Sequence, residues 1–273
     1  MPSDHLNNIA ELAESIAEEN ISKDKVNLER IAKRKDISLI YGNYDNCFLG
    51  QLMHASNKFY VYLNLDLLKK KRCARTRFTL GHELGHYFID EHRNKLKSGE
   101  SLSYTSDYSY VSNIPVEKEA NHFSSHLLMP KNRFIRIANS HEPGLASVLS
   151  LKDSFHTSYE GTAIHYVNMN LVPCMFIKWK ADLSYHYASY SSSFSNITGV
   201  KGKPGIKIRT DYIDEIFKAI DAEIPQPDYV ENATRLSDWL PNILPNSKKD
   251  LIGLEQTLKL GTFGGITFLV FPQ

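Results

Sequence analysis

The segment Leu80-Gly81-His82-Glu83-Leu84-Gly85-His86-Tyr87-Phe88 decides how this chain is interpreted. It lies within residues 73–90, where apolar side chains and the absence of proline predict a helix. On a helix His82 and His86 lie one turn apart on the same face, where two imidazoles can hold one metal ion. Glu83 is rotated by about 100° from His82 and so faces a water on the metal rather than the metal itself. The pattern predicts a zinc site with Glu83 as general base.

A catalytic zinc ion requires a third protein ligand and one open position for water, and the sequence offers two candidates for this ligand. His92 completes a spacing that resembles the metzincin motif, but that motif requires glycine where this chain has Ile89. The other candidate is Glu117, which lies 31 residues after His86. We favour Glu117 as the third ligand and expect His92 to be a polar or charged residue just beyond the end of the helix.

Glu117 lies near the start of a second predicted helix, which Pro115 opens and which runs to about Met129. Ala120 and Ser124 are small, so this helix can pack closely against the helix that carries the two histidines. Glu119 is rotated by about 200° from Glu117 and should face elsewhere.

Together these motifs resemble the ImmA/IrrE family of metallopeptidases. The resemblance rests on Arg75–His86 and on Glu117–Pro130, which reads Glu-x-x-Ala-Asn-x-Phe-x-x-x-Leu-Leu-Met-Pro, and it covers residues 25–170. The chain departs from the family pattern at two places. Gly81 replaces the usual alanine before the first motif histidine, and Ser124-Ser125 replace the common pair of small residues.

The resemblance implies a bacterial or phage zinc peptidase with an α+β fold. This fold would have a gluzincin-like, mainly helical core with a small sheet, followed by a smaller α+β domain. Family membership implies that His82, His86 and Glu117 bind Zn²⁺ and that Glu83 is the catalytic base. Characterised members cleave a helix-turn-helix transcriptional repressor, which relieves repression of stress-response or mobile-element genes. We therefore expect such a repressor as the protein partner.

The remaining sequence predicts two domains, with residues 1–171 forming the metallopeptidase domain and residues 172–273 a sensory or partner-binding domain. Residues 93–114 lack an apolar period and are expected to form a long, exposed and mobile loop that lies over or beside the cleft as a lid. The other expected elements are helices at 4–19, 26–32, 144–156, 158–169 and 211–222, and strands at 37–41, 47–54, 58–64, 175–180, 183–190 and 266–271.

Composition excludes several classes of protein. A net charge of +1 gives no overall attraction to nucleic acid, to a membrane or to an acidic substrate. The three cysteines, Cys47, Cys73 and Cys174, form no C-x-x-C pair, which argues against a disulfide framework and a thiolate zinc site. Residues 1–20 lack the apolar segment of a signal peptide, and the apolar run at 266–271 is too short to span a bilayer. We expect a cytoplasmic protein.

Two other functions compete with proteolysis. A metal-binding regulatory module without peptidase activity would not require Glu83, so the intact glutamate argues against it. The helix pair at 144–169 resembles a helix-turn-helix unit, but residues 142–170 carry three acids and one lysine, which opposes binding to phosphates. The sequence leaves the oligomeric state and the oxyanion stabiliser open. Candidates for that stabiliser are Tyr104, Tyr108, Tyr110, His122 and His126.

Overall fold

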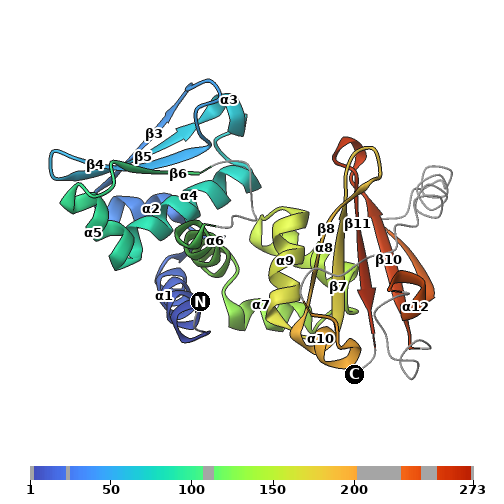
Figure 1. Cartoon of the computed structure of the whole chain (residues 1–273). Coiled ribbons are helices and arrows are strands. Elements are labelled where there is room, and N and C mark those ends of the chain that lie inside the picture. The colour runs from blue at the N-terminus through green and yellow to red at the C-terminus, as the bar shows by residue number, and fades with distance from the viewer. Residues whose placement is uncertain (1–2, 23–24, 107–113, 202–228, 241–250, 272–273) are drawn as a thin grey trace. The chain divides into compact units, whose positions relative to one another are not determined.

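The structure is a computed structural model that describes residues 3–22, 25–106, 114–201, 229–240 and 251–271 (Figure 1). It mixes helices and sheets, as the sequence predicts. Contacts within the chain divide it into two compact units. The first unit comprises Met1–Phe134 and Lys152–Gly161, and the second comprises Ile135–Leu151 and Thr162–Gln273.

This division does not follow the expected domain boundary near residue 171. Most of the predicted helix pair shares its contacts with the second unit. The backbone N–H of Leu145 donates to Gln256 Oε1 at 2.7 Å, and the ring of Tyr166 lies 6.0 Å from that of Phe268. Whether residues 1–171 fold independently of 172–273 stays a prediction.

The first unit contains a four-stranded sheet with strand order β3-β5-β4-β6. β3 and β5 are parallel, while β4 pairs antiparallel with both β5 and β6. The predicted hairpin is confirmed: Ser56 and Asn57 join β4 to β5, and both have positive φ angles, as a two-residue hairpin turn requires. The strands are β3 (Ile37–Gly42), β4 (Gly50–Ala55), β5 (Lys58–Asn64) and β6 (Ser103–Ser106), with a separate short pair β1 (Ile21–Ser22) and β2 (Lys25–Val26).

Helices pack against this sheet and against one another. α4 contacts β4, β5 and β6, and its other neighbours include α6, which also contacts α1 (Figure 1). The helices predicted at 4–19, 26–32, 73–90 and from Pro115 are confirmed. The helices of the first unit are α1 (Ser3–Glu19), α2 (Leu28–Arg34), α3 (Leu65–Leu68), α4 (Ala74–Phe88), α5 (Asp90–Ser98) and α6 (Pro115–Leu128).

The expectation of a long loop at 93–114 is wrong for most of the residues that the structure describes. Residues 93–98 belong to α5, whose C-cap Gly99 is in the left-handed conformation, and Ser103–Ser106 form β6. The helix was hidden because only His92 and Leu96 are buried, while Glu91 and Lys95 form an exposed ion pair. Residues 107–113 lie outside the described residues, so the lid stays a prediction for them.

The second unit is built on an antiparallel sheet with strand order β8-β7-β11-β10-β9. All residues of β7 and β11 are buried, and Trp179 and Trp239 belong to the apolar core beside them. The strands predicted at 175–180, 183–190 and 266–271 are confirmed, β9 and β10 were not predicted, and the helix predicted at 211–222 lies outside the described residues. The strands are β7 (Cys174–Trp179), β8 (Tyr185–Tyr190), β9 (Val230–Arg235), β10 (Ile252–Lys259) and β11 (Gly265–Val270).

The helix pair predicted at 144–169 is confirmed, and Ser158 accepts a hydrogen bond from the backbone N–H of Gly161, as expected of an N-cap. No helix in the described parts of the chain is both long and apolar enough to cross a membrane. The remaining helices are α7 (Lys131–Ala138), α8 (Leu145–Phe155), α9 (Tyr159–Met169), α10 (Ser192–Thr198), α12 (Leu236–Trp239) and the 3₁₀ helix η2 (Gly261–Phe263).

Candidate metal centre

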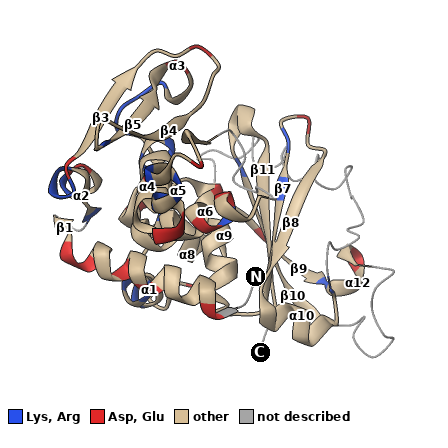
Figure 2. Ribbon diagram, turned by 60° about the vertical axis from the view of Figure 1, so that its left-hand side comes forward, with Lys and Arg blue, Asp and Glu red and all other residues tan. Residues whose placement is uncertain are grey.

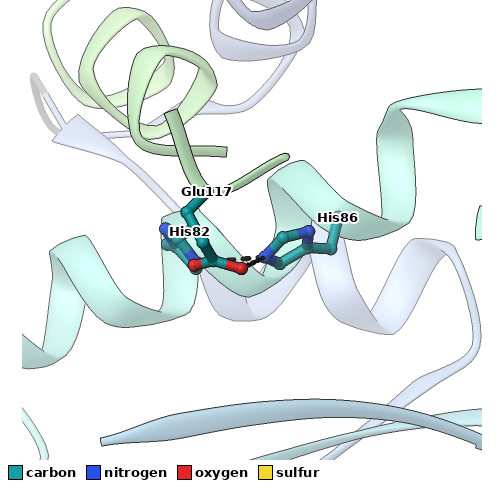
Figure 3. A group of neighbouring side chains, drawn as sticks. All are labelled: His82, His86 and Glu117. Carbon is teal, nitrogen blue, oxygen red and sulfur yellow. Dashed lines mark hydrogen bonds and ion pairs between the residues drawn. The ribbon is translucent and has the colours of Figure 1, made fainter. Parts of the chain in front are cut away.

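α4 and α6 bring together the three side chains that the sequence singles out. His82 and His86 lie on α4 and are buried, and Glu117 lies in the first turn of α6 (Figure 3). Pro115 occupies the first turn of α6, where its missing N–H leaves no helical bond unmade. Small residues let the helices approach closely, since a Cβ added at Gly85 would lie 3.2 Å from the backbone of Ala120.

The three donors lie close enough together to hold one metal ion. His82 Nε2 lies 3.0 Å from His86 Nε2 and 3.0 Å from Glu117 Oε2, and His86 Nε2 lies 3.5 Å from Glu117 Oε1. Ligands about 2.0–2.1 Å from a tetrahedral zinc ion are separated from one another by about 3.3–3.4 Å. Among the described residues these three form the group that can hold a metal ion.

The outer nitrogen of His82 is held by α6. His82 Nδ1 lies 2.9 Å from Asn121 Oδ1 and donates its proton there, which leaves Nε2 unprotonated in the neutral ring and free for a metal. Burial lowers the pKa of His82, but Glu117, Glu83 and Asn121 outweigh it and raise the pKa overall. A raised pKa means that the ring takes up a second proton, on Nε2, more readily. A metal cation bound at Nε2 would take the place of this second proton.

The outer nitrogen of His86, Nδ1, is held by His92 on α5. His86 Nδ1 lies 3.2 Å from His92 Nδ1, and His92 Nε2 lies 2.9 Å from Glu119 Oε2. If His86 Nε2 binds metal, its Nδ1 donates to His92, and His92 donates in turn to Glu119. Burial, then the neighbouring His82 and His92, hold the pKa of His86 well below its usual value, so the ring is neutral.

His92 lies just beyond the end of α4, as the sequence predicted. It is completely buried there, on α5. α4 ends at Ile89, whose extended backbone leads directly into α5. Glu119 faces away from Glu117 as predicted, and it also contacts His5 at 3.2 Å. These contacts place His92 and Glu119 on the side of His86 that faces away from Glu117.

Glu83 is buried next to the three donors. Its Oε1 accepts a hydrogen bond of 2.8 Å from Ser106 Oγ on β6, while its Oε2 has no hydrogen-bond partner among the described residues. Burial raises the pKa of Glu83 to about 7, against the lowering effects of His82 and Ser106. One oxygen is thus held by the protein and the other is available to a small polar molecule.

The candidates for the oxyanion stabiliser divide by position. His122 Nε2 lies 3.0 Å from Leu6 O and His126 Nδ1 lies 2.6 Å from Glu14 Oε1, so both rings contact α1 rather than the metal site. Tyr104 stacks on the ring of His86 with centroids 4.2 Å apart. Tyr108 and Tyr110 lie outside the described residues.

Comparison with known proteins agrees with this geometry. Residues 67–164, which include all four predicted site residues, match the family model described as the IrrE N-terminal-like domain, Peptidase_M78. This segment is similar to the IrrE N-terminal-like domain. The resemblance to the ImmA/IrrE family is thereby confirmed, and the family is one of peptidases.

A solved structure similar to this chain is that of a Mycobacterium tuberculosis transcriptional regulator. It is 15% identical, the similarity covers 98% of this chain and 77% of that chain, and the TM-score is 0.57. At this identity the similarity concerns the fold alone. No curated protein matches the chain in sequence.

Sequence reasoning missed the positioning roles of three residues: Ser106, which contacts Glu83, His92, which contacts His86, and Asn121, which contacts His82. Asn121 could have been found, because it lies four residues after Glu117 and so shares its helical face. Ser106 gave no such signal, since its contact with Glu83 depends on the pairing of β6 with β4, which joins segments far apart in the chain.

Proposed function

We propose that the chain is a zinc-dependent endopeptidase that cleaves a helix-turn-helix transcriptional repressor and so relieves repression of stress-response or mobile-element genes. The observation that carries the peptidase proposal is the position of Glu83 beside His82, His86 and Glu117, with one carboxylate oxygen unpartnered among the described residues. A site that only bound metal would gain nothing from burying this carboxylate.

The side chains present divide the chemistry among them. A bound zinc ion would supply Lewis acidity, which polarises the scissile carbonyl and makes water more acidic. Glu83 would take a proton from the attacking water through Oε2 and pass it to the leaving amine, while Ser106 holds Oε1 in place. Asn121 and His92 would hold the ligand rings in the tautomers that leave Nε2 free.

The edge of the sheet in the first unit supports the proposal that the substrate is a polypeptide. β6 is an edge strand, and in the described part of the chain it pairs on one side only, with β4. It carries both Ser106, which contacts Glu83, and Tyr104, which stacks on His86. An extended peptide that added to this edge would lie along the catalytic groups, with its backbone held by strand pairing.

The helices and the sheet that hold these groups also support a gluzincin-like core, which we infer for the first unit. We assign partner binding or sensing to residues 172–273.

A regulatory module that binds metal without proteolysis is the second candidate. The observation that favours it is the similarity of fold to a protein described as a transcriptional regulator. The two functions differ in whether Glu83 is required.

The experiment is to express the chain with a repressor encoded beside its gene and to measure cleavage by mass spectrometry. Glu83→Gln should retain zinc and lower the cleavage rate by about 10²–10⁴-fold, because it removes a general base. Glu117→Ala should lose both zinc and cleavage. Glu18→Gln, an exposed change of the same chemistry on α1, is the matched control and should behave as wild type. If Glu83→Gln relieves repression as well as wild type, proteolysis is not the function and the regulatory module replaces it.

A further inference from the structure

A second site lies at the N-terminal end of α4. The first unit contains a cavity of about 840 Å³, lined by β2, the segment that leads into α4, the first turn of α4 and residues 152–157. All of its lining residues belong to the first unit. This volume is typical of cavities that bind small molecules.

Basic side chains dominate the lining of this cavity. Five lysines and arginines face two acids, which leaves an excess of three positive charges, whereas the whole chain carries only +1. One of the two acids, Asp153, is paired with Lys152. In the part of the chain that the structure describes, no ion pair forms at the other four cations. The basic residues are Lys25, Lys71, Arg72, Arg77 and Lys152, and the acids are Glu29 and Asp153.

Arg77 is held in place at the cavity wall. Its Nη2 donates to Val26 O at 3.3 Å, while its Nε is buried without a hydrogen-bond partner among the described residues. Burial lowers the pKa of Arg77, and the nearby carboxylate of Glu29 partly offsets this effect. Besides burial, Lys25 and Arg77 both lower the pKa of the cavity residue His156. An anion would relieve this accumulation of positive charge.

The N-terminus of α4 also favours an anion in this cavity. Cys73, the N-cap of α4, makes no side-chain capping bond, and the first turn contains Arg75 and Arg77 but no acid. Cations at a helix N-terminus oppose the helix dipole, whereas an anion there gains from the dipole and from the backbone N–H groups. Arg72, Cys73 and Ala74 line the cavity, so this helix end faces it. Figure 2 shows that basic residues also lie on the neighbouring α2, while α1 carries acidic ones.

We propose that this cavity binds a small ligand that carries phosphate groups. The five cations line one concave pocket, which fits a compact phosphorylated molecule better than a nucleic-acid backbone. The site lies eight residues before His82 on the same helix, a distance of about 12 Å along its axis. A bound ligand would therefore stabilise the first turn of the helix that carries two of the metal ligands.

Calorimetric titration of the full chain with inorganic triphosphate tests the proposal. One binding site per chain is expected, and the affinity should fall as salt is raised. Lys71→Ala/Arg72→Ala removes two exposed cations from the cavity and should weaken binding by at least about tenfold. Lys58→Ala/Lys131→Ala is the matched control, because it removes two exposed charges outside the cavity and should leave binding unchanged.

Two further probes identify what the cavity recognises. Equal affinity for adenosine triphosphate and inorganic triphosphate means that the cavity binds the phosphates alone. Tighter binding of the nucleotide means that the cavity also holds the nucleoside. Both results support the proposal. Absence of triphosphate binding, or equal weakening in both double variants, overturns it. Binding of duplex DNA that is lost in Lys71→Ala/Arg72→Ala, without triphosphate binding, would assign these cations to a nucleic-acid surface instead.

Discussion

Replacing Gly81 by alanine should destabilise the contact between α4 and α6. A Cβ added at Gly81 would lie 2.5 Å from Ser124 Oγ, and the Ser124 hydroxyl donates to Phe78 O at 2.9 Å. Ser124 is completely buried, so its oxygen can yield only by breaking that bond. Overpacking costs about 1–3 kcal/mol, and the better helix propensity of alanine returns up to about 1 kcal/mol. We expect Gly81→Ala to lower the unfolding free energy by about 1 kcal/mol.

Removing the serine oxygen should reverse this loss. In Gly81→Ala/Ser124→Ala the new Cβ would lie 3.5 Å from the Cβ of residue 124, an ordinary van der Waals distance. The double variant loses one hydrogen bond worth about 1 kcal/mol and gains about 1 kcal/mol of helix propensity. Its stability should therefore be close to wild type, with a coupling energy of about 1–3 kcal/mol in its favour. The two departures from the family pattern would then compensate each other.

The assay must report on the first unit. Both tryptophans, Trp179 and Trp239, lie in the second unit, so their fluorescence would miss the effect. Hydrogen exchange of the backbone amides of α4 and α6, read by mass spectrometry, measures the local opening free energy. Ser125→Ala is the matched control, because its hydroxyl donates to Asn121 O and not toward α4. If the two changes at 81 and 124 add to within about 0.5 kcal/mol, the compensation is refuted.

Three other predictions concern the surroundings of the metal site. Glu119→Ala should lower zinc affinity about 10–100-fold in competition with a chelating dye, because His86 loses its indirect support; unchanged affinity would contradict the role of this carboxylate. Ser106→Ala should retain zinc but slow cleavage about tenfold, since Glu83 loses the group that holds it; equal rates would exclude that role. Burial lowers the pKa of His122 to about 4 from an ordinary 6.5, so the unfolded chain binds this proton more tightly. Wild type should therefore lose up to about 3 kcal/mol more stability than His122→Asn as pH falls from 6.5 to 4 in acid unfolding, and parallel curves would contradict this.

The ligands of the candidate metal site could be predicted because each depends on local structure. His82 and His86 are related by one helical turn, and Glu117 follows a proline that opens a helix. α5 and β6 could not be predicted in the same way. α5 buries only His92 and Leu96, and β6 is polar and becomes a strand through pairing with β4. Where burial depends on a distant partner, the hydrophobic pattern along the chain carries little information.

The position of His92 shows how one backbone residue determines the role of a histidine. Its spacing from His86 is that of a third metal ligand, but such a ligand requires the chain to turn back sharply, typically at a glycine. Ile89 instead has φ −73° and ψ 110°, and the chain continues into α5. This path brings His92 to the outer nitrogen of His86, where it can orient the ring, while Glu117 Oε1 lies 3.5 Å from His86 Nε2. The same spacing thus provides a positioning residue, because the third donor of the candidate metal site comes from another helix.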